Sequence, residues 1–195
     1  IITYQSINSI HRTNTFVTDD YFGFLDDNEG SDDLTDRLYL GIGRFPVKNT
    51  TEAQAAVNKV NSYLAEQSTG KWKKLITFIG DDEDGNIHMR DANMLAGKIE
   101  TSYPQFDVRK IFLDNYKKIT ASTGKGYPDA ENQINRTISE GTLIFNYVGH
   151  GSENVLASEQ IVNIAGIKKW NNINRLPLFV TATCEFSRFD NPYQT

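Results

Sequence analysis

From residue 71 onward, the chain alternates between short apolar runs and longer amphipathic segments. The runs are rich in β-branched and aromatic residues, which is typical of buried strands, and they fall at 75–79, 108–113, 142–148 and 176–183. Between them, apolar residues recur at helical spacing at 92–99, at 128–138 and, in a short segment that Asn163 can cap, at 164–170. This alternation predicts an α/β fold, a parallel sheet with helices on both faces.

The first 70 residues have a weaker pattern. The run LYLGI at 38–42 predicts a short buried strand, and a turn is expected at 43–46. Asn49 or Thr50 can then cap a helix, and Gly70 is expected to end this part of the chain. One face of that helix is apolar and consists of Ala53, Ala56, Val57, Val60 and Leu64. The acidic stretch at 26–36 is expected to be a solvated loop, with a calcium site as the alternative, although its spacing lacks the EF-hand pattern.

Reactive side chains follow three of the predicted strands. The run TLIFNYV stops at Gly149-His150-Gly151, and the run LPLFVTAT stops at Cys184, the only cysteine, 34 residues after His150. The run at 75–79 is followed by Gly80-Asp81-Asp82. In parallel α/β sheets, ligands bind outside the carboxyl ends of the strands. The sequence therefore predicts that these side chains meet at one edge of the sheet.

A cysteine and a histidine at one sheet edge form a nucleophile pair. A free thiol has a pKa of about 8.5 and attacks as the thiolate, so a neighbouring imidazole is needed to take its proton. The backbone N–H groups of Gly151 and Cys184 are candidates for an oxyanion hole. A carboxylate, Asp82 or alternatively Asp81, is expected to orient the ring of His150.

Each of these residues also has an ordinary structural interpretation. A lone cysteine is usually an inert small hydrophobic residue, Gly-His-Gly can be a simple turn, and paired aspartates often cap helices. The other two histidines, His11 and His88, are expected to be surface or capping residues, since no zinc-type spacing joins them. The coincidence of all three features at one predicted edge favours the catalytic interpretation.

Composition narrows the classes of function. A net charge of −5 offers no basic face for nucleic acid, and no apolar run approaches the roughly 18 residues of a membrane span. One cysteine excludes an internal disulfide. The chain starts without Met and stops 11 residues after Cys184, so we expect it to be a piece of a longer protein.

Three segments resemble the gingipain family of cysteine peptidases: GIGRFPV at 41–47, NYVGHGSE at 146–153 and LPLFVTATCEFSRFDNP at 176–192. The continuation CEFSRFD at 184–190 is more similar to the PorU-type sortases of the type IX secretion system. The resemblance implies a caspase-like fold truncated at both ends. Residues 1–70 would then be the remnant of an N-terminal caspase-like subdomain, and 71–195 a catalytic subdomain that lacks its C-terminal part.

For the site, the resemblance implies Cys184 as nucleophile, His150 as general base and acid, and an acidic residue that supports the histidine. We place that residue at Asp82, with Asp81 as the alternative. Ser152 and Glu153 are the candidate substrate-binding residues, and no cofactor or metal is implied beyond the calcium alternative. Arginine-specific gingipains carry a specificity acid after the first core strand, and the comparable stretch here, 86–90, has none. This absence favours a sortase over a trypsin-like protease.

PorU-like enzymes remove the C-terminal sorting domains of secreted proteins through an acyl-thioester. They can pass the new carboxyl end to a lipopolysaccharide amine. The resemblance thus implies polypeptide substrates, other secretion-system subunits as partners, and a place at the cell surface or outer membrane, or a secreted form, in a Gram-negative bacterium. The alternatives are a general secreted gingipain-like protease, an inactive caspase-like scaffold and a receiver-like signalling domain. Since part of the substrate pocket would be missing, we expect little activity from this chain alone.

Overall fold

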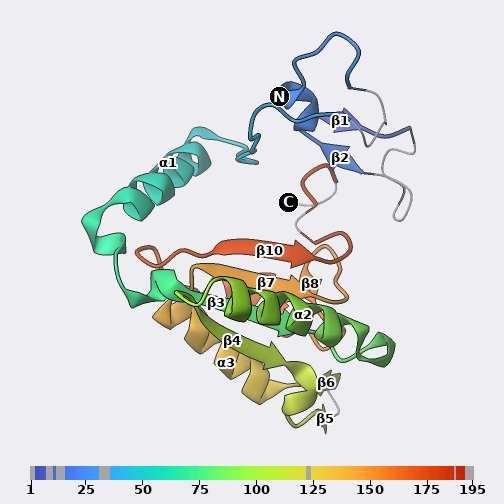
Figure 1. Cartoon of the computed structure of the whole chain (residues 1–195), viewed down its shortest axis with the longest axis vertical. Helices are drawn as coiled ribbons and strands as arrows, with labels where there is room; N and C mark the ends of the chain where they lie inside the picture. Colours follow the sequence, from blue (N-terminus) through green and yellow to red (C-terminus); the bar gives the residue numbers. More distant parts are fainter. Residues whose placement is uncertain are drawn as a thin grey trace. The chain divides into compact units, whose positions relative to one another are not determined.

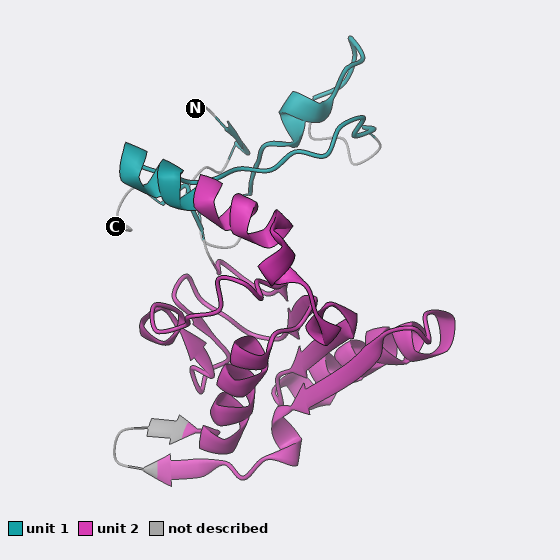
Figure 2. Cartoon of the chain, turned by 90° about the vertical axis from the view of Figure 1, so that its left-hand side faces the viewer, with its two compact units in different colours: residues 1–56, 188–195 teal, residues 57–187 magenta. Residues whose placement is uncertain are grey.

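The structure is a computed structural model that describes residues 3–7, 11, 16–30, 36–121, 124–186 and 188–191. The chain divides into two compact units, residues 1–56 with 188–195, and residues 57–187 (Figure 2). Within the described ranges, no helix has both the length and the apolar character that a membrane crossing requires. The predicted site residues all lie in the unit formed by 57–187.

The centre of this unit is a four-stranded, all-parallel sheet in the order β10-β7-β3-β4 (Figure 1). Its strands are β3 (Leu75–Gly80), β4 (Asp107–Phe112), β7 (Ile144–Val148) and β10 (Leu178–Ala182). Val148 pairs with Gly80 on one side and with Ala182 on the other. The three neighbouring strands β10, β7 and β3 therefore end level with one another.

Successive side chains of each strand point to opposite faces of the sheet, and a helix packs against each face. On one face, Ile79, Phe145 and Tyr147 pack with residues of α3 (Pro128–Glu140). On the other, Ile76 and Phe78 pack with Ala96 of α2 (Ile87–Ser102). The predicted α/β architecture is confirmed.

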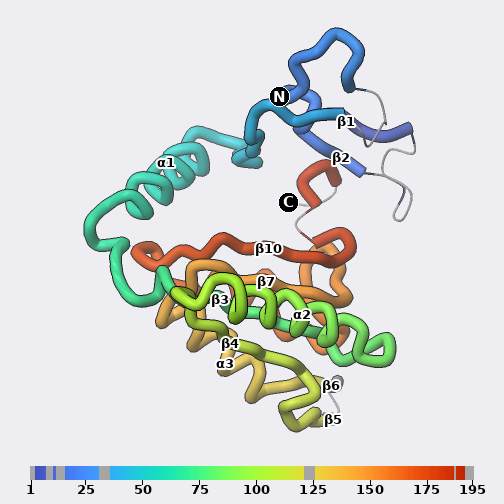
Figure 3. The backbone as a smooth tube through the Cα atoms, viewed as in Figure 1, coloured from blue at the N-terminus to red at the C-terminus, as the bar shows by residue number. Residues whose placement is uncertain are grey.

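Shorter elements complete the chain, whose order can be followed by colour in Figure 3. The 57–187 unit also contains η2 (Glu66–Ser68), η3 (Lys71–Lys74), η4 (Asp84–Asn86), η5 (Leu113–Asn115), the pair β5 (Ile119–Ala121) and β6 (Gly124–Gly126), the pair β8 (Val155–Leu156) and β9 (Val162–Asn163), and α4 (Ile164–Ile167). The other unit has β1 (Tyr4–Gln5) paired with β2 (Val17–Thr18), and η1 (Asp20–Gly23). Helix α1 (Thr50–Leu64) spans the boundary between the units.

The helix caps that the sequence predicts are present. Asn49 accepts a hydrogen bond from the N–H of Glu52 at 2.9 Å, and its side-chain amide donates to the Glu52 carboxylate, so Asn49 caps the N-terminus of α1. Asn163 caps α4 by accepting from the N–H of Gly166 at 2.9 Å. The expectation for Gly70 was wrong, because α1 already ends at Leu64 and Gly70 instead precedes η3.

The predicted strand at 38–42 was also wrong. Among the described residues this segment carries no strand ladder. Its hydrogen bonds to another segment run from the N–H of Tyr39 to the carbonyl of Gly23 and from the Tyr39 hydroxyl to the Asp26 carboxylate. Leu38, Tyr39 and Leu40 are largely exposed. An apolar run without a partner strand is insufficient to form a sheet, since each strand needs its backbone groups paired.

Part of the acidic stretch folds around its own carboxylates. Glu29 accepts hydrogen bonds from the backbone N–H groups of Leu25, Asp26 and Arg37, and Asp36 accepts one from Gly30. The segment 31–35, which includes two of the aspartates, lies outside the described residues. The calcium alternative stays a prediction.

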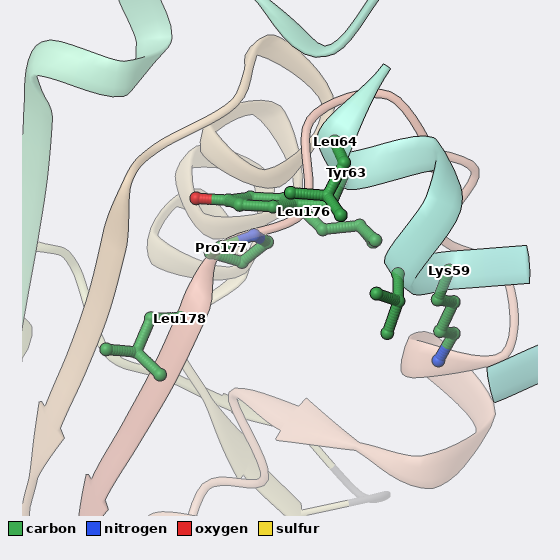
Figure 4. Close-up of a pocket in the computed structure, with 7 residues that line it drawn as sticks. Lys59, Tyr63, Leu64, Leu176, Pro177 and Leu178 are labelled. Atoms are coloured by element: carbon green, nitrogen blue, oxygen red, sulfur yellow. The ribbon is translucent and has the colours of Figure 1, made fainter. Parts of the chain in front are cut away.

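An apolar hollow of about 390 Å³ lies where α1 passes the segment leading into β10 (Figure 4). Its lining comes from Lys59, Val60, Tyr63, Leu64, Leu176, Pro177 and Leu178. It lies at the amino end of β10, opposite the end that leads to Cys184, so it is separate from the predicted site.

Candidate active site

The predicted site residues follow directly from three neighbouring strands. The N–H of Asp81 donates to the carbonyl of Val148 at 3.1 Å, and the N–H of Gly149 donates to the carbonyl of Ala182 at 3.3 Å. These bonds continue the ladders by one residue and tie the three strand ends together. His150 and Cys184 each lie two residues beyond the paired Val148 and Ala182. The structure thus brings Asp81, His150 and Cys184 to one edge of the sheet.

The backbone of His150 is fixed by three hydrogen bonds. Its N–H donates to the Asp81 carboxylate at 3.0 Å, and its carbonyl accepts from the Tyr147 hydroxyl at 2.6 Å and from the N–H of Ala157 at 2.8 Å. Asp81 and Tyr147 are fully buried, whereas the His150 side chain is 42% exposed. The ring therefore projects toward solvent from a rigid base.

The Asp81 carboxylate accepts hydrogen bonds from backbone N–H groups and not from the ring of His150. One carboxylate oxygen accepts from the N–H of His150, the other accepts from the N–H of Asp82 at 2.9 Å, and the Tyr147 hydroxyl lies 3.5 Å away. Burial raises the pKa of Asp81, and the two backbone hydrogen bonds partly oppose that rise. Burial likewise raises the pKa of Tyr147.

The two glycines around His150 are needed because other atoms approach them closely. A Cβ at Gly149 would overlap the Cβ of Asp81 and the phenol of Tyr147. A Cβ at Gly151 would overlap the hydroxyl of Thr183. The second contact packs the Gly-His-Gly turn against the residue that precedes Cys184.

The ring of His150 contacts an acid other than the predicted one. Its Nε2 lies 2.9 Å from Oδ2 of Asp84, at the start of η4, and 3.8 Å from Oε2 of Glu83. Asp82 instead accepts hydrogen bonds from the Tyr127 hydroxyl at 2.7 Å and from Nζ of Lys118 at 3.2 Å. The backbone turns after β3, so Asp81, Asp82 and Asp84 face three different surroundings.

Lys118 joins two carboxylates beside this turn. Its ammonium group lies 2.7 Å from Glu159 and 3.2 Å from Asp82, and these contacts raise its pKa despite some burial. Burial and the Asp82 carboxylate raise the pKa of Tyr127 to about 12. For Asp82, burial acts to raise the pKa, but the hydrogen bonds from Tyr127 and Lys118 outweigh it and lower the pKa.

A lowered carboxylate pKa makes the stability of the fold depend on pH. The folded state favours the Asp82 carboxylate more than the unfolded chain does, so this stabilisation is present above the ordinary value of 3.8 and is lost as the pH falls through the folded pKa. Asp82→Asn is expected to lower the free energy of unfolding by about 1–2 kcal/mol at pH 7. The difference from wild type should shrink below pH 4 in urea titrations. Asp114→Asn, at an exposed carboxylate, is the control; an Asp82 effect that is constant with pH would contradict the expectation.

The segment after β10 carries the exposed Cys184. The Cys184 thiol is exposed, and the Cys184 carbonyl accepts from the N–H of Phe186 at 2.7 Å across a left-handed Glu185. Within the described part of the chain, neither the N–H of Cys184 nor that of Gly151 has a hydrogen-bond acceptor. Both groups are therefore available to a ligand. Ser152 is exposed, with its N–H bonded to the Val155 carbonyl, and Glu153 is half-buried.

Several residues of the site carry no clear signal in the sequence. The ring of His88 lies edge-on to that of His150 with centroids 5.0 Å apart, so the expectation that His88 is a surface or capping residue misses this contact. The one available sign was the i,i+4 spacing of Asp84 and His88 at the start of a helix. Lys118 and Glu159 come from loops that no periodicity relates to the site.

A parallel sheet covered by helices, with a cysteine and a histidine at the carboxyl edge, is the architecture of a caspase-like cysteine peptidase domain. The family model of peptidase family C25 matches residues 1–195, and the chain belongs to this family, the gingipain family. Among curated protein sequences, no match was found.

Two solved structures share the fold. The crystal structure of the Arg-specific cysteine proteinase gingipain R (RgpB) matches with a TM-score of 0.66 at 17% identity, over 90% of this chain and 38% of that one. The complex of Porphyromonas gingivalis RgpB pro- and mature domains matches with a TM-score of 0.56 at 18% identity, over 75% of this chain and 33% of that one. The caspase-like fold that the resemblance implied is thus confirmed. The chain spans less than two fifths of either relative.

Proposed function

We propose that this chain carries the acyl-transfer centre of a cysteine peptidase. The observation that supports it best is the register of β7 and β10. Val148 and Ala182 are paired, and His150 and the exposed Cys184 each follow two residues later in their own strands' continuations. Cys184 attacks the scissile carbonyl carbon through sulfur, and His150 takes the thiol proton and gives it to the departing amine. The C–N bond breaks, and a thioester remains on Cys184.

For the orienting acid we propose Asp84 in place of Asp82 or Asp81. Its Oδ2 lies at hydrogen-bond distance from Nε2 of His150, whereas the other two carboxylates are held by other donors. A proton on Nε2 shared with Asp84 leaves Nδ1 as the nitrogen that accepts the thiol proton. Asp84 also stabilises the imidazolium that forms when the thiolate is generated.

The oxyanion is held, in this proposal, by the N–H groups of Gly151 and Cys184. Both are without an acceptor among the described residues, and the Gly151–Thr183 contact keeps the two turns together. In other acyl-transfer enzymes each such donor is worth about 2.7–4 kcal/mol of transition-state stabilisation. Ser152 and Glu153 follow the turn and are proposed to contact the substrate chain.

At a finer level we propose a PorU-type sortase. Its support is the CEFSRFD segment at 184–190 and the lack of an acid at 86–90, a stretch that contains His88 instead. The substrates would be polypeptides with C-terminal sorting domains, cleaved at the cell surface or outer membrane alongside other secretion-system subunits. Water or a lipopolysaccharide amine would release the acyl group. In such an enzyme, residues 1–70 and 71–195 would belong to two caspase-like subdomains.

Covalent capture tests the acyl-transfer centre. A peptidyl acyloxymethyl ketone reacts with an activated thiolate, and Cys184 is the only thiol in the chain, so the adduct can be located by mass and peptide mapping. We expect the folded chain to react at least about 100-fold faster than the same chain in urea, because His150 activates the thiol. Cys184→Ser should give no adduct. Equal rates for folded and unfolded chain would contradict the proposal.

A second measurement separates the sortase from a general protease. A peptide that ends in a sorting-domain junction is offered together with a primary amine, and the products are identified by mass. A new amide supports transfer to an amine acceptor. Cleavage of unrelated peptides at equal rates, with only the free acid as product, supports the general protease instead.

A further inference from the structure

Two histidines and an aspartate form a cluster at the end of β3 and β7. The ligand atoms of Asp84, His88 and His150 all lie within 4.8 Å of one another. Oδ2 of Asp84 is 2.9 Å from Nε2 of His150 and 3.5 Å from Nε2 of His88. The proposed proton transfer uses only the first of these contacts, so His88 has no part in it.

The two distances from Asp84 are close to those of a tetrahedral transition-metal site, and the ligand atoms of His88 and His150 lie within 4.8 Å of each other. Zinc binds nitrogen and oxygen ligands at about 2.0–2.2 Å, which places tetrahedral ligand atoms roughly 3.3–3.5 Å apart. The Asp84–His88 distance already meets this value, and the Asp84–His150 distance needs an opening of about half an ångström. Asp84 is the ligand able to adjust, because its side chain is 59% exposed.

His88 provides a nitrogen that lies near the Asp84 carboxylate without forming a hydrogen bond to it. Its Nε2 is buried and has no hydrogen-bond partner among the residues the structure describes, and its side chain is only 20% exposed. A buried polar atom without a partner is costly, and a bound cation would satisfy it. The nitrogen faces Asp84 from the first turn of α2. The backbone of His150 is held by its hydrogen bonds to Asp81 and Tyr147.

The ligand types select the class of ion. Two imidazole nitrogens with one carboxylate suit Zn²⁺ and Co²⁺, whereas Ca²⁺ and Mg²⁺ prefer oxygen ligands throughout. Three protein ligands leave a fourth position for water or another group, as in open zinc sites.

We propose that Asp84, His88 and His150 form a binding site for Zn²⁺ or a similar divalent transition-metal ion, and that the bound ion shuts off acyl transfer. The inhibition, though not the metal binding, rests on the proposed function. A neutral imidazole that gives its Nε2 lone pair to the ion carries its proton on Nδ1. His150 then has no free lone pair for the thiol proton, and Asp84 no longer orients the ring.

Cobalt tests the site without any enzyme assay. Co²⁺ titrated into the purified chain should produce visible absorption bands of a low-coordinate nitrogen and oxygen site, and Zn²⁺ should abolish them by displacement. His88→Gln removes one ligand at nearly constant size and is expected to weaken binding by at least about tenfold. His11→Ala, at the remaining histidine, is the matched control and should bind as wild type does. Circular dichroism verifies that each variant is folded.

Two results would overturn the metal site: no visible bands with wild type, or bands that His88→Gln leaves unchanged. The second arm follows adduct formation at Cys184 in the presence of Zn²⁺. His88→Gln should need at least about tenfold more Zn²⁺ than wild type for the same slowing. Equal sensitivity would show that the ion acts on the thiol directly and would overturn the inhibition. Cobalt binding with no activated thiol would leave the metal site standing while the proposed function fails.

Discussion

Replacing His150 with alanine is expected to slow acylation of Cys184 by about 10²–10⁴-fold, the usual contribution of a positioned general base. The peptidyl acyloxymethyl ketone gives the rate of thiol modification directly. The fold should hardly change, because the three hydrogen bonds that anchor residue 150 use its backbone N–H and carbonyl. A large kinetic loss without a loss of stability is therefore the expected signature.

Asp84→Asn is expected to slow acylation of Cys184 as well, but by a smaller factor. An amide at the same position keeps the size of the side chain but does not compensate the positive imidazolium, so the rate should fall by less than in His150→Ala. Asp82→Asn, whose carboxylate faces Tyr127 and Lys118, should affect the rate less than Asp84→Asn. An acylation rate for His150→Ala within threefold of wild type would contradict the pairing of His150 with Cys184. A larger loss of rate in Asp82→Asn than in Asp84→Asn would favour Asp82, the residue predicted from sequence, as the orienting acid.

The second large effect is expected at Gly149. A Cβ there would overlap Asp81 and Tyr147, both fully buried, so neither neighbour can move without disrupting the hydrogen bonds that hold His150. We expect Gly149→Ala to lower the free energy of unfolding by about 3 kcal/mol, at the upper end for overpacked sites. Urea unfolding monitored by circular dichroism measures it, and adduct formation at Cys184 should slow in parallel.

Gly97→Ala is the matched control for that substitution. Gly97 lies inside α2, where an added Cβ meets no atom within 4 Å. Alanine is the better helix former by about 0.8–1.0 kcal/mol, so this variant should be more stable than wild type. The expectation for Gly149 fails if both variants change stability in the same direction by the same amount.

The sheet could be predicted from sequence because its strands are near-continuous apolar runs. The run at 75–79 is buried on both faces of the sheet, and the run at 144–148 is buried on one face and half-buried on the other. Polar residues that follow such runs must lie at the sheet edge. The segment at 38–42 has similar composition, but no strand among the described residues pairs with it, and composition does not reveal whether a partner strand is present. The pair β5 and β6 was not predicted, because strands of three residues with few apolar positions leave no periodic pattern.

The acid that contacts His150 could not be predicted for a different reason. The turn after β3 reads Asp-Asp-Glu-Asp, four residues with the same functional group, and only the backbone angles decide where each carboxylate points. Asp84 has a positive φ of 55°, an unusual conformation that redirects the chain into η4. His88 was missed because it reaches the site through the first turn of a helix, and its contact with His150 joins segments 62 residues apart in sequence.

Because β3, β7 and β10 end at paired residues, the positions of the site residues do not depend on the length of the chain that connects these strands. The 34 residues from His150 to Cys184 pass through β8, β9 and α4 before they return, yet the paired Val148 and Ala182 alone determine where both side chains begin. Insertions or deletions in that connecting segment can change what surrounds Cys184 and still leave His150 at the same edge of the sheet. The length of the connecting segment can therefore vary while the ladder between two neighbouring strands keeps both side chains at that edge.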